Sequence, residues 1–130
     1  MPRKVMIVDD EPHMLRVIEL SISKGAYAIV IARNGFEAIE LAAREKPDLI
    51  VMDVAMPEMD GITALRHLKA APETAGIPVI MLTVRGQALT RRQAEDAGAA
   101  LFLTKPFSPT LLLAETRRIL GEAPAIAPQP

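Results

Sequence analysis

Five residues of the chain have the chemical types needed to move a phosphoryl group, although they lie far apart in the sequence. Each lies within two residues of the end of an apolar segment; they are Asp9, Asp10, Asp53, Thr83 and Lys105. Clustered carboxylates repel one another, and a hard divalent cation such as Mg²⁺ relieves that repulsion while leaving room for a phosphate. A lysine ammonium and a threonine hydroxyl could then bind the phosphoryl oxygens. The set therefore predicts phosphoryl transfer in which Asp53 is the carboxylate nucleophile.

These residues can meet only if the apolar segments before them are neighbouring strands of one sheet. Residues 5–8, 49–52 and 79–82 are continuous apolar runs, typical of parallel strands that helices cover on both faces. Residues 26–32 and 100–103 are weaker candidates for two further strands. Because the carboxyl ends of parallel strands lie along one edge of a sheet, the five residues would gather in one crevice there.

Segments with helical periodicity alternate with these strands. Proline at a first helical position, serine as an N-cap, and glycine or proline at the far ends mark their limits. The expected helices run from Pro12 to near Gly25, and over about residues 35–45, 62–71, 87–97 and 108–120. The alternation predicts an α/β fold, a single doubly wound (βα)5 domain with right-handed crossovers. We expect this domain to cover residues 1–121, and residues 122–130, rich in Pro and Ala, to be a linker or a disordered tail.

The composition argues against several other kinds of protein. A formal net charge of -1, with 24% charged residues, gives no basic footprint for nucleic acid. The chain has no cysteine, which rules out disulfides and thiolate metal sites. No apolar stretch approaches the roughly 18 residues that a membrane helix needs, and the N-terminus has no signal-peptide core. We therefore expect a cytoplasmic protein that binds neither nucleic acid nor membrane.

Four short segments resemble the signature blocks of the receiver domain of two-component response regulators, the CheY-like family. They are IVDDE at residues 7–11, MDVAMPEMDG at 52–61, MLT at 81–83 and TKPF at 104–107, and the similarity covers about residues 3–121. Each block alone is a weak signal, but four in the family's order are specific. The resemblance implies a flavodoxin-like sheet of strand order 2-1-3-4-5. It also implies phosphoryl transfer from a histidine kinase or a histidine phosphotransfer protein.

The resemblance assigns roles to the residues of the crevice. Asp53 matches the phosphoacceptor. Asp10 matches the direct ligand of Mg²⁺ (or Mn²⁺), Asp9 an acid that acts mainly through water, and the backbone carbonyl of Ala55 completes the metal shell. Thr83 and Lys105 match the pair that senses the phosphoryl group.

Further positions follow from the same resemblance. Phe102 matches the aromatic switch residue that turns inward when the threonine moves toward the phosphoryl group. Pro57 and Gly61 lie in the loop after the third strand, and Pro106 would follow a cis peptide bond from Lys105.

The fourth helix, fifth strand and fifth helix form the face that would pass the signal to a partner or output domain. An acidic pair and an arginine often join two receivers through ion pairs on this face, and here those positions hold Ala100, Leu101 and Glu115. We therefore expect an apolar partner face that includes Leu101 and Leu111 and could support a homodimer.

Each residue taken alone has a simpler interpretation. Strand-end aspartates often cap helices or form turns, a lone lysine is usually solvated, and Phe102 could be an ordinary core aromatic. Only the convergence of the set on one sheet edge favours the functional interpretation.

Other functions fit parts of the pattern. A docking module that never becomes phosphorylated would share the fold, but such modules usually lose an acid or the lysine. A second alternative is a Mg²⁺-dependent phosphohydrolase with an aspartyl-phosphate intermediate. Enzymes of the haloacid-dehalogenase type place their two carboxylates two residues apart after the first strand, whereas Asp9 and Asp10 are adjacent. An FMN phosphate would be repelled by residues 9–11. We expect no enzymatic turnover beyond hydrolysis of the chain's own acyl phosphate.

Overall fold

The computed structural model describes residues 2–84 and 88–122, and in these residues five strands alternate with five α-helices. The strands are β1 (Lys4–Val8), β2 (Ala28–Ala32), β3 (Leu49–Asp53), β4 (Val79–Thr83) and β5 (Leu101–Thr104). The helices are α1 (Pro12–Ile22), α2 (Gly35–Glu45), α3 (Gly61–Ala70), α4 (Ala88–Asp96) and α5 (Pro109–Ile119). A short 3-10 turn, η1 (Ser23–Gly25), separates α1 from β2.

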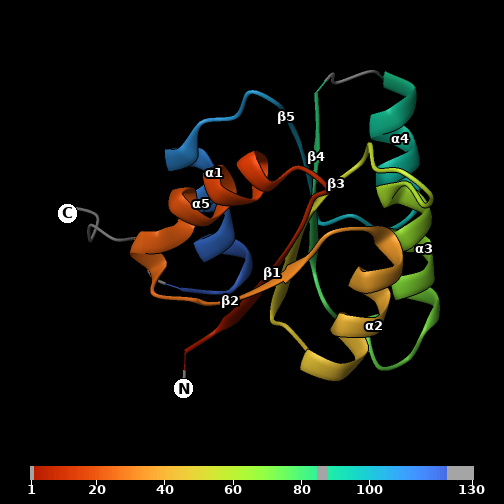
Figure 1. Cartoon of the computed structure of the whole chain (residues 1–130), viewed down its shortest axis with the longest axis horizontal. Helices are drawn as coiled ribbons and strands as arrows, with labels where there is room; N and C mark the ends of the chain where they lie inside the picture. Colours follow the sequence, from red (N-terminus) through yellow and green to blue (C-terminus); the bar gives the residue numbers. More distant parts are fainter. Residues whose placement is uncertain (1, 85–87, 123–130) are drawn as a thin grey trace.

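All four strand pairings are parallel, and the strand order is β2-β1-β3-β4-β5. This confirms the predicted doubly wound α/β fold. The central position of β1 and β3 brings their carboxyl ends side by side, and β4 and β5 continue the same edge (Figure 1). The chain reverses its direction of winding between β1 and β3, which is where ligands bind in sheets of this kind.

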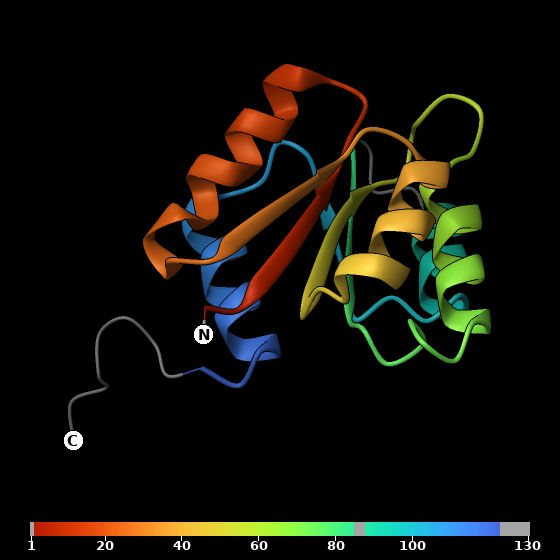
Figure 2. The ribbon, with the colours of Figure 1, turned by 60° about the horizontal axis from the view of Figure 1, so that its bottom comes forward.

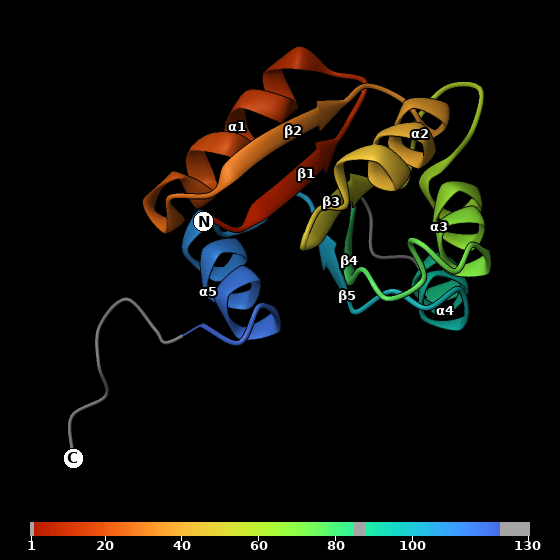
Figure 3. The ribbon, with the colours of Figure 1, turned by 90° about the horizontal axis from the view of Figure 1, so that it is seen from below.

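Helices cover both faces of the sheet, with α1 and α5 on one face and α2, α3 and α4 on the other (Figures 2 and 3). Each face has its own apolar cluster. Val5 and Ile7 of β1 belong to the cluster under α1 and α5, whereas Met6 and Val8 belong to the other. The strands are therefore buried on both faces, which explains why their sequences are continuous apolar runs.

Capping side chains decide where several helices begin. Asn34, Asp60 and Ser108 accept hydrogen bonds from the backbone N–H of the third residue after each of them, at 2.8, 2.9 and 3.2 Å. Because Asp60 is the cap, α3 begins at Gly61, one residue earlier than the apolar periodicity indicates.

The two weaker strand predictions differ from the structure at their ends. Ala26 has a φ of 57°, a left-handed conformation that ends η1, so β2 begins at Ala28 and not at residue 26. The fifth strand begins and ends one residue later than predicted. Residue 87, where the fourth helix is predicted to begin, lies outside the described residues.

The described chain ends in contact with the domain. The Tyr27 hydroxyl donates a hydrogen bond of 2.8 Å to Glu122, and the Glu122 backbone N–H donates to the Arg117 carbonyl. The other residues of the predicted tail, 123–130, lie outside the described part. None of the described helices is long and apolar enough to span a membrane.

Candidate functional site

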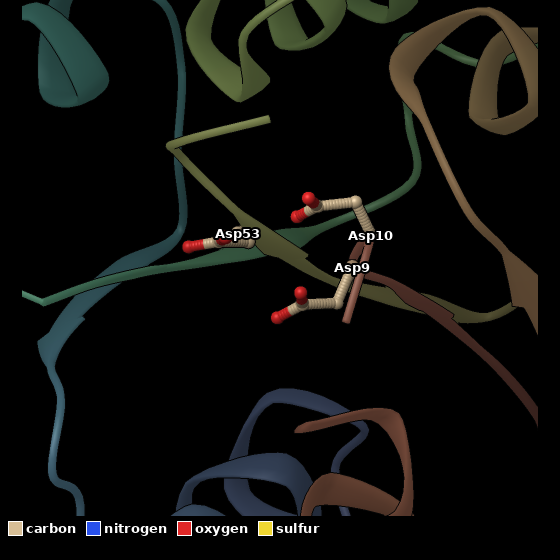
Figure 4. A group of neighbouring side chains, drawn as sticks. All are labelled: Asp9, Asp10 and Asp53. Atoms are coloured by element: carbon tan, nitrogen blue, oxygen red, sulfur yellow. The ribbon is translucent and has the colours of Figure 1, made fainter. Parts of the chain in front are cut away.

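Three carboxylates come together at the carboxyl edge of the sheet. Asp9 and Asp10 directly follow β1, Asp53 is the last residue of β3, and one oxygen of each lies within 4.8 Å of the others. Figure 4 shows the three side chains turned toward a common space from these two strand ends. The side chains of Asp9 and Asp53 are buried, while that of Asp10 is exposed.

Lys105 provides the positive charge that faces the two buried acids. Its side chain is only 8% exposed, and its Nζ lies 3.2 Å from Asp9 Oδ2 and 3.2 Å from Asp53 Oδ1. The backbone N–H of Lys105 donates a hydrogen bond to the Thr83 carbonyl, which fixes the lysine beside the end of β4. This bond directly follows the last β4–β5 pair, Thr83 with Thr104. The following peptide bond, Lys105–Pro106, is cis, as the resemblance implies.

Asp9 also stabilises the start of α1. Its Oδ1 accepts a hydrogen bond of 3.0 Å from the backbone N–H of Glu11, the residue before the first helical one, while its Oδ2 faces Lys105. Asp9 therefore forms the turn before α1 with one oxygen and faces the site with the other, whereas α1 itself has no side-chain cap.

Asp53 is the carboxylate with unsatisfied bonding capacity. Its Oδ1 is buried and, although the Lys105 ammonium lies 3.2 Å away, accepts no hydrogen bond of favourable geometry from the described residues. Burial raises the pKa of the Asp53 carboxyl above its ordinary value; the Lys105 ammonium opposes this rise and the Asp9 carboxylate adds to it. A further cation beside Asp53 would favour its ionised form, so three acids with one lysine fit a divalent metal.

The loop between β3 and α3 directly follows Asp53 and borders this site. It is anchored at both ends, since the Val54 N–H donates to the Leu82 carbonyl and the Gly61 N–H donates to the Val54 carbonyl, each at 2.8 Å. Ala55 and Pro57 are exposed within the loop. The backbone N–H of Ala55 also favours the ionised form of the Asp53 carboxyl, which places Ala55 at the site.

Thr83 and Phe102 lie on the α3–α4 side of the sheet. Thr83 is 8% exposed, and Met81, two residues before it, pairs with Phe102 of β5. Since side chains alternate along a strand, Thr83 shares a face with Met81 and Phe102. The Phe102 ring is inward and 5% exposed, in the same core cluster as Met81. The structure thus brings Thr83 to the edge of the site and makes Phe102 a core residue beside it.

The two leucines of the predicted partner face differ in exposure. Leu111 is 44% exposed at the start of α5, whereas Leu101 is half-buried and packs against the α1–α5 cluster. The nearby charges of Glu115 and Arg118 are paired with each other at 2.6 Å. Leu111 is therefore the more accessible apolar group.

The structure reveals two contacts that the sequence did not indicate. A Cβ on Gly61 would collide with the carbonyl oxygen of Asp53, so this glycine is required for close packing behind the site. The guanidinium of Arg91 lies over the Phe102 ring, 5.2 Å from its centroid. In the sequence, Gly61 after Asp60 indicates only a turn. Nothing in the sequence distinguishes Arg91 from the other charged residues of its helix.

Known proteins resemble this chain over nearly its whole length. Residues 5–117 match the response regulator receiver domain family. The chain is 34% identical, over 98% of its length, to the alkaline phosphatase synthesis transcriptional regulatory protein PhoP of Bacillus subtilis, and covers 52% of that protein. It is 38% identical, over 92% of its length, to the response regulator PleD of Caulobacter vibrioides, and covers 26% of that protein. The chain thus spans about half or less of these curated relatives.

Solved structures resemble it as well. A putative response regulator from Chloroflexus aurantiacus has a TM-score of 0.88 at 31% identity, with 94% of this chain and 100% of the other covered. The receiver domain of the sensor histidine kinase PA1611 from Pseudomonas aeruginosa has a TM-score of 0.86 at 29% identity, with the same coverage, and its structure contains a magnesium ion coordinated in the active-site cleft. With the family match, the strand order and the acidic cluster in agreement, the chain belongs to the response regulator receiver domain family of two-component systems.

Proposed function

We propose that this receiver domain accepts a phosphoryl group on Asp53 from a phosphohistidine of a histidine kinase or a histidine phosphotransfer protein. The observation that supports this best is the charge arrangement around Asp53. A buried carboxylate has one oxygen without a good hydrogen bond, a lysine ammonium at 3.2 Å and two further carboxylates close by. Such a group is poorly suited to stabilising the fold and well suited to bonding a new partner.

The chain's own residues carry the transfer. An Asp53 carboxylate oxygen forms the new bond to phosphorus as the bond from phosphorus to the imidazole nitrogen breaks. The imidazole leaves as a neutral ring because its other nitrogen already carries a proton. Lys105 neutralises charge on the phosphoryl oxygens, and the Thr83 hydroxyl donates a hydrogen bond to one of them. Positioning and charge neutralisation supply the catalysis, and no separate acid or base is required.

Asp9, Asp10 and Asp53, with the backbone carbonyl of Ala55, would hold Mg²⁺ or Mn²⁺. The ion supplies neutralisation of the negative charges that meet when a phosphoryl group approaches carboxylates. Asp10 is exposed and forms no ion pair with a residue that the structure describes, so it can turn to a metal without breaking one. Asp9 is already bonded to Lys105 and to the Glu11 N–H, which suits contact through water.

Transfer of radiolabel from a phosphorylated histidine phosphotransfer protein tests this function. We expect label on the chain when Mg²⁺ is present, loss of that label in alkali as expected for an acyl phosphate, and no label on Asp53→Asn. Absence of transfer from this donor, and from acetyl phosphate as well, would favour the alternative of a docking module that is never phosphorylated.

Binding of Mg²⁺ should stabilise the chain through the acidic cluster. At ten times its dissociation constant, Mg²⁺ should raise the free energy of unfolding by about 1.4 kcal/mol. Asp10→Asn should remove most of this gain because it removes a carboxylate that is paired with no lysine or arginine within residues 2–84 and 88–122. Glu40→Gln, which removes an exposed carboxylate of α2, is the matched control. Thermal unfolding with and without Mg²⁺ measures the gain, and an equal gain in Asp10→Asn would contradict the ligand assignment.

The face formed by α4, β5 and α5 would pair two copies of the chain or bind its output domain by apolar contact. Leu111→Glu should weaken self-association about tenfold, because a charge would replace a leucine side chain in the interface. Leu101→Glu is a poorer test, since Leu101 packs on the core. Sedimentation equilibrium of the phosphorylated chain measures the effect. The control is Leu20→Glu, which changes a leucine of α1 that is more exposed than Leu111. Equal association of both variants and the original chain would refute the apolar face.

A further inference from the structure

The contact between Arg91 and Phe102 joins helix α4 to the strand that leads into the site. Arg91 lies in α4, and its guanidinium carbon is 5.2 Å from the centroid of the Phe102 ring in β5. This is within the range of a cation–π interaction, and arginine also stacks on rings through its planar guanidinium. The arginine is exposed while the ring is 5% exposed, so the guanidinium lies on the outer side of an inward ring.

The ring is also close to the site along the sheet. Phe102 pairs with Met81, and the next pair on the same face joins Thr83 to Thr104, which precedes Lys105. Thr83 and Phe102 are therefore diagonal neighbours on the face covered by α4, a spacing at which long side chains interact. Displacement of the Thr83 side chain toward Asp53 would change the space in front of the ring.

We propose that Arg91 is a positioning residue for Phe102: its guanidinium holds the ring inward and so links the position of α4 to the state of the phosphoryl site. This inference rests on the proposed function for its signalling meaning. The contact itself is present without a phosphoryl group, so Arg91 favours the inward ring before phosphorylation. If the Phe102 ring turned outward, it would lose its contact with the Arg91 guanidinium and would also become exposed to solvent.

The conformation of Phe102 can be measured directly by fluorine NMR after incorporation of 4-fluorophenylalanine. The chain has three phenylalanines, Phe36, Phe102 and Phe107, so Phe36→Leu and Phe107→Leu assign the signals. Arg91→Gln should raise the outward population about two- to fivefold, the factor that corresponds to about 0.5–1 kcal/mol for an exposed cation–π contact. Arg91→Lys should give a smaller rise, since an ammonium keeps the charge but not the planar stacking.

Arg92→Gln is the matched control, because it removes the same charge from the next position of the same helix, where the residue is also exposed. It should leave the ring population unchanged. Identical Phe102 signals in Arg91→Gln, Arg92→Gln and the original chain would overturn the inference. Far-UV circular dichroism of both variants establishes that α4 is retained in each.

Acetyl phosphate with Mg²⁺ separates this inference from the proposed function. Phosphorylation should raise the fraction of Arg91→Gln molecules in which the Phe102 ring is inward, because the phosphoryl group and the guanidinium both favour the inward conformer. A ring that stays outward in phosphorylated Arg91→Gln would refute the link between the site and Phe102. A chain that gains no phosphate refutes the proposed function, while the comparison of unphosphorylated variants still decides the role of Arg91.

Discussion

Replacing Lys105 by methionine is expected to slow phosphorylation of Asp53 on the order of 100-fold, the usual effect of removing one preorganised donor to developing charge. The Nζ of Lys105 is buried and lies 3.2 Å from a carboxylate oxygen of both Asp9 and Asp53. No other described lysine or arginine forms an ion pair with these two carboxylates. Methionine has a similar length and no charge, which limits the change in packing. The rate of phosphate incorporation from acetyl phosphate at fixed Mg²⁺ measures the effect.

The same variant should shift the pH dependence of the reaction in a defined direction. Burial raises the pKa of the Asp53 carboxyl and the Lys105 ammonium opposes that rise. Removing the ammonium should therefore raise the pKa further, and because only the ionised carboxylate is a nucleophile, the rate should reach half its maximum at a higher pH. Lys24→Met, which removes an exposed ammonium, should change neither the rate nor the profile. A profile unchanged in Lys105→Met would mean that Lys105 does not act on Asp53.

Gly61→Ala is expected to destabilise the fold by about 3 kcal/mol, at the upper end of the usual cost of overpacking. The added Cβ would collide with the carbonyl oxygen of Asp53, and it would lie 2.9 Å from the Met81 methyl carbon. The methionine side chain can move aside, but the carbonyl is part of the β3 backbone and can move only with the strand end. The variant should therefore also displace Asp53 and lower its rate of phosphorylation.

Gly76→Ala is the matched control for this substitution. A Cβ at Gly76 would meet no heavy atom within 4 Å, so the free energy of unfolding should stay the same or rise by up to about 1 kcal/mol. Urea unfolding of both variants measures the difference. Equal stability of Gly61→Ala and Gly76→Ala would show that the start of α3 adjusts to a side chain and does not fix the position of Asp53.

Much of the fold follows from hydrophobic patterning alone. The apolar runs at residues 49–52 and 79–82 correspond to β3 and β4, because strands buried on both faces leave no polar alternation. Helix α2 begins and ends as predicted, since Asn34 caps it and Lys46 ends it. The start of β2 was less predictable because the left-handed residue before it, Ala26, is neither glycine nor asparagine.

The composition of the candidate site was predictable for a topological reason. In a parallel sheet the strand ends converge, so Asp53 and Lys105 could be placed together without knowing any side-chain contact. What the sequence could not reveal is how the charges divide, with Asp9 buried against the lysine and Asp10 exposed. Packing contacts such as that of Arg91 with Phe102 also depend on three-dimensional distances that no spacing in the sequence encodes.

The division of roles among the three acids links the structure to the proposed switching. Both carboxylate oxygens of Asp9 already accept hydrogen bonds, one from the Glu11 N–H and one from the Lys105 ammonium. Asp53 keeps an oxygen without a good hydrogen bond, and a phosphoryl group attached there would draw on Lys105 and Thr83. In the proposed function, a change at Thr83 would be passed toward Phe102 and α4, because Thr83 shares one face of the sheet with Phe102.

Mass spectrometry of the chain after incubation with a phosphorylated histidine phosphotransfer protein and Mg²⁺ tests the central claim most directly. Reduction of the acyl phosphate with borohydride followed by peptide mapping identifies the modified residue. The account predicts one phosphate per chain, located on Asp53, and none when Mg²⁺ is chelated. Phosphate on another residue, or an unmodified Asp53 under conditions in which the donor phosphorylates its own receiver, would contradict it.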